Sequence, residues 1–327
     1  MSGGTAAPST PLTAAPPRTR LDLPRLLRLW LPPLLLLVPV AALCVLGRFD
    51  GLYGQDPYWY YNYATGPARA SLLGLRPLPP FFWPPGYPLL VALVSLVLGP
   101  TPAAGQVVSL GLGAAATIFT GLLAEEVWVR GRGQASGALP AWLVPLAAAL
   151  LVACQPQLWQ SSAVVMADST GLAAAAFGAW ALARYARLRS GAWLILAGAG
   201  LAFAVLTRWI YGLAALAGAA YALSLMLRPQ AGARAPHRVA WLHAAGAAAI
   251  ALLVLSPLLT SAGGAVAPGV DSASFAGSFQ VYTWHPLNAF RREFITTDGV
   301  LSYRLPNGLY YALAPLHRYF FTPLLGA

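Results

Sequence analysis

The stretch that decides the fold runs from Trp193 to Leu227 and reads WLILAGAGLAFAVLTRWIYGLAALAGAAYALSLML. Its only charged residue is Arg208, which stands near the middle. A bilayer core about 30 Å thick is crossed by about 20 apolar residues of a helix, so this stretch is long enough for two spans. We therefore predict two transmembrane helices that meet at Arg208 on the outer face of a membrane.

Apolar runs of similar length recur along the rest of the chain. Of the 327 residues, 58% are hydrophobic and 9% are charged, whereas about a quarter of the residues in a soluble domain are charged. No alternating β-barrel segments are evident, so the spans should be helices, which satisfy their own backbone hydrogen bonds in lipid. The predicted fold class is an all-α, polytopic transmembrane bundle of about seven spans. The expected spans are about 29–46, 106–128, 139–154, 169–183, 193–206, 209–227 and 239–259.

The arginines indicate which side of the membrane each loop faces. A net charge of +11 would suggest nucleic acid as a partner for a soluble protein, but here the basic residues lie in short loops between apolar runs. We expect no nucleic acid. If the short apolar segment 87–98 does not cross, these loops and the N-terminal arginines share one side, as the positive-inside rule requires. We therefore predict a multi-pass protein of the cell membrane with a cytoplasmic N-terminus, and a surface or re-entrant helix at 87–98 on the outer face.

The chain divides into three parts. Residues 1–27 begin with a stretch rich in Pro, Ser, Thr, Ala and Gly that has no apolar period, so we expect a disordered cytoplasmic tail. Residues 28–260 are the expected membrane domain, which includes an outer loop at 48–102. Residues 261–327 are expected to begin on the outer side.

The outer loop holds the candidate catalytic residue. It reads GQDPYWYYNY over 54–63 and FWPPGYP over 82–88. A carboxylate just outside a span and among aromatic rings lies in partly dry surroundings, where it takes up a proton more readily than in water. Asp56 is therefore a candidate general base. The loop also offers rings on which a substrate could stack, although an aromatic belt at headgroup level is the plainer explanation for them: Tyr58, Trp83 and Tyr87.

Three further residues on the outer side are candidates for substrate binding. Asp168 opens the span 169–183, where capping of the helix explains an acid as well as a catalytic or metal-binding role does. Arg208 has the planar guanidinium that matches a phosphate, and snorkelling to the lipid headgroups is the alternative. His285 is a candidate for binding an anionic group, and a solvated loop explains it equally well.

The order of these features resembles the GT-C superfamily of polytopic glycosyltransferases, in the branch related to protein O-mannosyltransferases and aminoarabinose transferases. The motifs that carry the resemblance are GQDPYWYY at 54–61, WPPGYP at 83–88, MAD at 166–168 and LTRW at 206–209. The resemblance covers about 27–311. It implies that the first outer loop supplies a catalytic Asp, here Asp56. It also implies a polyprenyl-phosphate sugar as donor, with its lipid tail between helices and its phosphate at an Arg such as Arg208.

The chain departs from that family pattern at two places. The family often has two adjacent acids in the loop, whereas Gln55 precedes Asp56 here. We therefore assign no metal ligands, and a divalent metal stays open as a cofactor. Members of the family usually continue through further spans, so the resemblance implies that 261–327 includes an incomplete C-terminal segment.

The hypothesis is that Asp56 removes a proton from an acceptor hydroxyl, which attacks the anomeric carbon of the donor sugar while the lipid phosphate leaves. Two other classes of function stay open. One is a transporter or flippase for a lipid-linked or anionic substrate, with Arg208 and Asp168 along its pathway. We find no inverted repeat, which many transporters have. The other is a membrane scaffold without catalytic activity.

Overall fold

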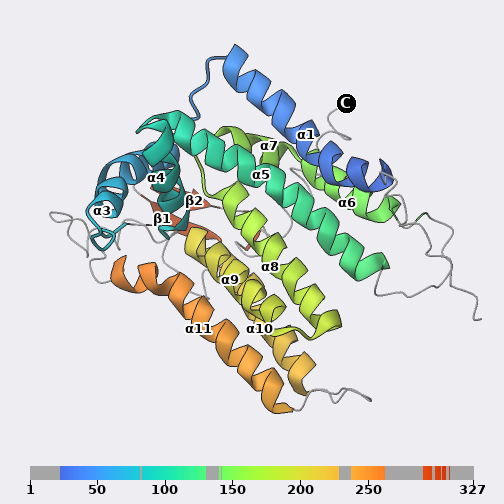
Figure 1. The fold of residues 1–327 in the computed structure, drawn as a ribbon. Coiled ribbons are helices and arrows are strands. Elements are labelled where there is room, and N and C mark those ends of the chain that lie inside the picture. Colours follow the sequence, from blue (N-terminus) through green and yellow to red (C-terminus); the bar gives the residue numbers. More distant parts are fainter. Residues whose placement is uncertain are drawn as a thin grey trace, which may run out of the picture.

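In a computed structural model of the chain, the described residues are 23–81, 83–129, 140, 142–227, 237–261, 290–296, 299–302, 304–306 and 309. They are almost entirely helical (Figure 1). The long apolar runs form helices because a helix pairs each backbone N–H within the segment itself, as lipid requires. The main helices are α1 (Leu23–Leu46), α5 (Pro102–Ala124), α6 (Leu143–Ala153), α7 (Pro156–Ala163), α8 (Asp168–Leu188), α9 (Gly191–Thr207), α10 (Gly212–Leu227) and α11 (His237–Ser261).

Among the described residues, four helical segments are long and apolar enough to cross a membrane, and a fifth is added if the bent pair α6 and α7 counts as one span. The four are Leu26–Leu46, Pro102–Trp128, Trp209–Leu227 and Val239–Leu258. The structure thus confirms an all-helical, membrane-type fold for the bulk of the described residues. It does not confirm seven spans, because α9 has only 17 residues and α8 carries charges at both ends.

The outer loop that we predicted for 48–102 is itself helical. It forms α2 (Gln55–Tyr63), a π-helical turn η1 (Ala64–Ala68), α3 (Arg69–Leu73) and α4 (Gly86–Leu98). Helix α4 packs against α5 and α9, and also against α2, η1 and α3, so the loop is a folded cap rather than an extended strand of chain.

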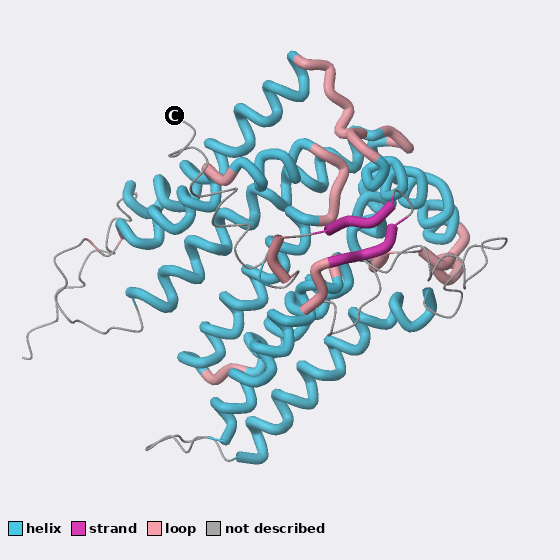
Figure 2. The backbone as a smooth tube through the Cα atoms, turned by 180° about the vertical axis from the view of Figure 1, so that it is seen from behind, coloured by secondary structure: helices cyan, strands magenta, loops and turns pink. Residues whose placement is uncertain are grey.

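The long helices lie side by side in one bundle (Figures 1 and 2). Helix α8 packs between α5 and α9, and α9 packs against α11. The contacts are close because small residues face one another. A Cβ atom on Gly200 of α9 would lie 3.0 Å from the Cα atom of Gly178 on α8. Small residues of this kind let the backbones of membrane helices approach each other.

The bundle has two distinct ends. At one end, Arg28 of α1 pairs with Glu125, which follows α5, and Arg184 of α8 pairs with the adjacent Glu126. We call this the Glu126 end. At the opposite end of α8 stands Asp168, and we call it the Asp168 end. The structure thus brings Arg28 of α1 and Arg184 of α8 to the same end of the bundle. The side of a membrane that each end faces stays a prediction.

The structure differs from the sequence-based expectations in three places. Helix α1 begins at Leu23, so residues 23–27 of the predicted tail are helical. The predicted turn 155–168 contains helix α7, at 58° to α6. A short antiparallel hairpin, β1 (Glu293–Thr296) and β2 (Gly299–Ser302), lies within the predicted outer segment 261–327 (Figure 2). The β-branched residues Ile295, Thr296 and Val300 favour strands.

Candidate functional site

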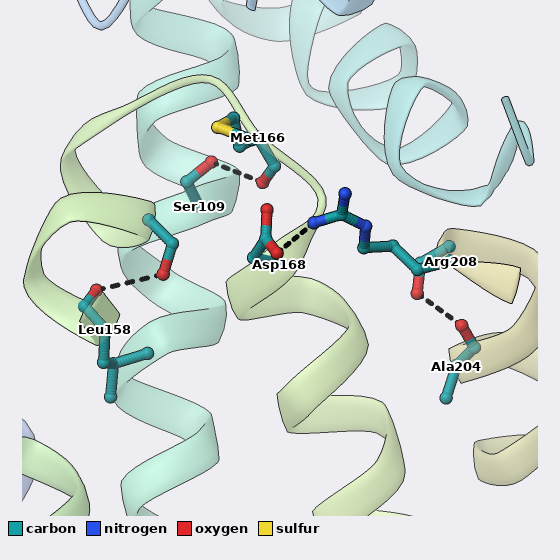
Figure 3. A network of polar contacts seen from close by, with 8 residues as sticks. Ser109, Leu158, Met166, Asp168, Ala204 and Arg208 are labelled. Atoms are coloured by element: carbon teal, nitrogen blue, oxygen red, sulfur yellow. Dashed lines mark hydrogen bonds and ion pairs between the residues drawn. The ribbon is translucent and has the colours of Figure 1, made fainter. Parts of the chain in front are cut away.

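An ion pair between Asp168 and Arg208 marks the Asp168 end of the bundle. Arg208 Nη1 donates a hydrogen bond to Asp168 Oδ1, although the two residues are 40 positions apart in the sequence (Figure 3). Asp168 is the first residue of α8, and Arg208 follows the last residue of α9. Both side chains are about a third exposed, at 35% for Arg208 and 30% for Asp168. The pair is therefore open to solvent or to a ligand.

The backbone at Arg208 separates two helices. Its φ of −152° and ψ of 131° are extended, and the short 3-10 turn Trp209–Tyr211 follows before α10 begins. This break confirms that the apolar stretch is divided at Arg208. Burial alone would lower the pKa of the Arg208 guanidinium, but the neighbouring Asp168 carboxylate raises it, and the pKa lies above its usual value. The guanidinium thus stays charged beside its partner.

The segment that leads to Asp168 is fixed by contacts with the start of the outer loop. The backbone N–H of Val165 donates to the carbonyl of Gly51 at 3.0 Å. Gln106 Nε2 donates to the carbonyls of Phe49 at 2.9 Å and Ala163 at 3.2 Å. The positive φ of 83° at Gly51 favours glycine there. These bonds hold the beginning of the loop next to the chain that enters α8.

Tyr60 is the centre of the aromatic residues at this end. Its ring stacks on Trp83 with centroids 5.0 Å apart, and it meets the rings of Tyr87 and Phe81 edge on, at 5.3 and 5.8 Å. These rings come from α2, from the segment before α4 and from α4 itself. Tyr60 is only 3% exposed. The aromatic residues thus form a packed cluster beneath α2.

Three charged groups act on this buried tyrosine. Burial raises the pKa of the Tyr60 hydroxyl most, Arg208 lowers the pKa, and Asp168 and Asp56 raise it. A charge that shifts the pKa of a buried group lies near that group. Asp56 is in the first turn of α2, one helical turn before Tyr60, so both residues lie on the same side of the helix. Asp56 and the Asp168–Arg208 ion pair thus share an electrostatic influence on one buried hydroxyl.

The other predicted site residues fall into different places. Tyr87 is fully buried, and its hydroxyl bonds to Ser109 Oγ at 2.8 Å and to the carbonyl of Gly105 at 3.2 Å. The ring and hydroxyl of Tyr87 thus belong to the core, and its role in substrate binding stays a prediction. Trp83 packs on Tyr60 as part of the aromatic cluster. His285 lies outside the described residues.

Tyr58 belongs to a separate surface of α2. With Gly54, Gln55, Trp59 and Asn62 it lines an open groove of about 500 Å³. The side chain of Asp50, which precedes α2, accepts the backbone N–H of Leu52 at 3.0 Å. Asp50 therefore caps a local turn at the exposed start of the loop.

Sequence reasoning missed Gln106 and Tyr60. Gln106 was read as the start of an apolar run, and nothing in its local pattern shows that it bonds to residues 57 positions away on either side. Tyr60 was one of several aromatic residues in the loop. If the loop had been predicted as a helix, the spacing of four residues would have placed Tyr60 on the same side of that helix as Asp56.

Metal binding finds no support among the side chains that the structure describes. Within those residues, no group of three or more His, Cys, Asp or Glu side chains lies close enough to hold a metal ion. Asp56 and Asp168 are the acids near Tyr60, and Asp168 is already paired with Arg208.

The chain matches no family model, no curated protein and no solved structure.

Proposed function

We propose that this chain is a membrane glycosyltransferase that moves a sugar from a polyprenyl-phosphate donor to an acceptor hydroxyl at the Asp168 end. The observation that carries the proposal is the partly exposed ion pair of Asp168 and Arg208, which together with Asp56 acts electrostatically on Tyr60. One carboxylate to accept a proton and one guanidinium to bind a phosphate are the two groups that such a transfer requires. They come from three segments that are far apart in the sequence.

Asp56 is the general base in this proposal. Within the described residues its carboxylate has no hydrogen bond or ion pair, in contrast to Asp168 and Asp50. An unpaired carboxylate keeps its lone pairs for the proton of an acceptor hydroxyl. General-base catalysis of this kind contributes about a hundredfold to ten-thousandfold in rate.

Arg208 binds the donor phosphate in this proposal. A guanidinium has five N–H donors, and within the described residues its bond to Asp168 uses the Nη1 group. The remaining donors form a planar fork that suits phosphate oxygens. Asp168 then acts as a positioning residue, because its ion pair holds the Arg208 guanidinium at the Asp168 end and fixes the orientation of that group. Arg208 stabilises the charge that develops on the departing lipid phosphate.

The surface next to Arg208 suits the lipid tail of such a donor. Ile210 and Leu213 follow Arg208 and are 58% and 59% exposed. Leu216, one turn further along α10, is 69% exposed. A guanidinium at the head of an exposed apolar helix offers a phosphate site and a path for a polyprenyl chain at once. We include in the proposal that α8 and α9 also cross the membrane, which gives seven spans with the Asp168 end outside.

Sugar transfer from a radiolabelled polyprenyl-phosphate donor, measured with the purified protein in liposomes, tests the proposal. The Asp56→Asn variant keeps the shape of the side chain and removes the base, so transfer should fall at least a hundredfold. Asp50→Asn is the matched control, because Asp50 lies in the same loop and its side-chain oxygen caps a turn. It should retain transfer.

Two outcomes contradict the proposal. The first is equal transfer by the wild-type protein and the Asp56→Asn variant. The second is the absence of transfer from any of a panel of polyprenyl-phosphate sugars, together with movement of the intact donor between leaflets. That second result would indicate a transporter or flippase.

A further inference from the structure

At the Glu126 end, five charged side chains from three helical segments meet. Arg28 Nη2 lies 3.3 Å from Glu125 Oε2, and Arg184 Nη1 lies 3.7 Å from Glu126 Oε2. Arg187 Nε donates to Glu126 Oε1. Both glutamates belong to η2 (Glu125–Val129), the π-helical turn that extends α5. A π-helical turn changes the direction in which successive side chains point, and such turns are frequent at functional sites.

A cavity of about 170 Å³ lies among these charges. Arg28 and Arg184 line the cavity together with the two glutamates, and Leu29 and Leu122 form an apolar part of its wall. The ring of Trp180 also lines the cavity. Positive charge, apolar wall and an aromatic ring at the end of a helix bundle are the surroundings that a phosphate headgroup and its glycerol require.

Arginines and glutamates alternate around the cavity. Arg28 pairs with Glu125, and Arg184 and Arg187 both pair with Glu126. Glu126 is 3% exposed in its side chain, so its charge is neutralised by protein groups rather than by water.

Arg184 has a donor to offer to such a ligand. Its Nε is buried and has no hydrogen-bond partner among the described residues. The guanidinium lies over the rings of Trp193 at 4.6 Å and Trp180 at 5.7 Å, which hold it in one orientation. A buried N–H without an acceptor is unfavourable. An oxygen atom in the cavity that Arg184 lines would remove that cost.

We propose that this cavity binds an anionic phosphate ester. The site is separate from the one at Arg208 and does not depend on the proposed transferase activity. Anionic lipid headgroups and soluble phosphate esters share this chemistry, and basic pockets between helices on the cytoplasmic side of membrane proteins bind lipids of this kind. Bound at the cavity, the phosphate would join α1, α5 and α8 and stabilise the bundle.

Thermal unfolding of the full chain in nanodiscs tests the site. In phosphatidylcholine nanodiscs that include phosphatidylglycerol, the wild-type protein should unfold about 2 to 4 °C higher than in phosphatidylcholine alone. Arg28→Gln removes one positive charge from the cavity wall and should abolish this difference. The control is Arg189→Gln, which removes a charge at the same end of α8 from a side chain that bonds to the carbonyl of Leu225 and does not line the cavity. It should retain the shift.

A second variant distinguishes loss of the binding site from destabilisation of the fold by Arg28→Gln. Leu122→Trp fills the cavity and leaves all five charges in place, so it should remove the phosphatidylglycerol shift without lowering stability in phosphatidylcholine. If inorganic phosphate added to phosphatidylcholine nanodiscs produces the shift in the wild-type protein, the ligand is a soluble ester; if only phosphatidylglycerol does so, it is a lipid. No shift with either probe overturns the proposal. So does an equal shift in the wild-type protein, Arg28→Gln and Leu122→Trp.

Discussion

The guanidinium of Arg208 and the carboxylate of Asp168 form an ion pair across the gap between the start of α8 and the end of α9 (Figure 3). Each partner occupies a helix terminus where the chain changes direction. The pair therefore connects two helices that are already packed along their length by small residues. It also fixes the position of Arg208, whose charge lowers the pKa of Tyr60, whereas Asp168 and Asp56 raise it.

The first prediction concerns the strength of this pair. Because both side chains are about a third exposed, the pair should contribute more than a typical surface ion pair and less than a buried one. We expect a coupling energy of about 1–2 kcal/mol. A double-mutant cycle of Asp168→Asn, Arg208→Gln and the combined variant, measured by unfolding in detergent, gives this value directly. Additive effects of the two substitutions would show that the pair contributes nothing to stability.

The second prediction concerns the hydroxyl of Tyr60. Tyr60→Phe keeps the ring that stacks on Trp83 and removes the hydroxyl on which Arg208, Asp168 and Asp56 act. If the site at this end is catalytic, sugar transfer should fall at least tenfold while the unfolding temperature changes little. The comparison is Tyr63→Phe, because the Tyr63 hydroxyl donates to the carbonyl of Pro79, away from these charges. A reversed pattern, with transfer lost only in Tyr63→Phe, would remove Tyr60 from the site.

Hydropathy and charge were enough to predict the helical fold and the division at Arg208. A window of about 20 apolar residues identifies a long helix, and Arg208 was the only charge in the stretch from Trp193 to Leu227. The same reasoning could not detect α7. That helix has eight residues and includes Gln157, Gln160 and two serines, so it has neither the length nor the apolar character of a span.

The charged residues of the candidate site could be predicted from the sequence, but their arrangement in space could not. Asp56, Asp168 and Arg208 each stand out in the sequence because an ionisable residue beside a span is costly without a role. The burial of Tyr87 was not predictable, since its bond to Ser109 joins two helices by contacts that no local pattern records. Long-range side-chain contacts of this kind depend on how the helices pack.

The third prediction uses the pH dependence of stability. Burial raises the pKa of Tyr63 to about 12, against about 10 in an unfolded chain. The folded state thus holds this proton more tightly, so the stability contributed by the protonated hydroxyl is complete below pH about 10 and is lost as the pH rises toward about 12. Tyr63→Phe should lower stability at neutral pH by about 1 kcal/mol. Its unfolding temperature should decline less steeply than that of the wild-type protein over this alkaline range. Equal slopes would contradict the assignment.

The fourth prediction compares two glycines of α5 that lie two positions apart. A Cβ atom on Gly113 would lie 2.1 Å from Ser162 Oγ, whereas one on Gly111 would meet no atom within 4 Å. The new methyl group would also lie 3.1 Å from Ser162 Cβ and 3.2 Å from Leu36 Cδ2, so rotation of the Ser162 hydroxyl does not relieve all of the crowding. Gly113→Ala should therefore destabilise the bundle by about 1–3 kcal/mol. Gly111→Ala should be neutral or stabilise it by up to about 1 kcal/mol, because alanine is the better helix former and the space is open. Thermal unfolding of both variants in the same detergent measures the contrast. A loss of stability in Gly111→Ala as large as that in Gly113→Ala would show that helix propensity or lipid contact, and not the close approach of α7, determines the effect of alanine in this helix.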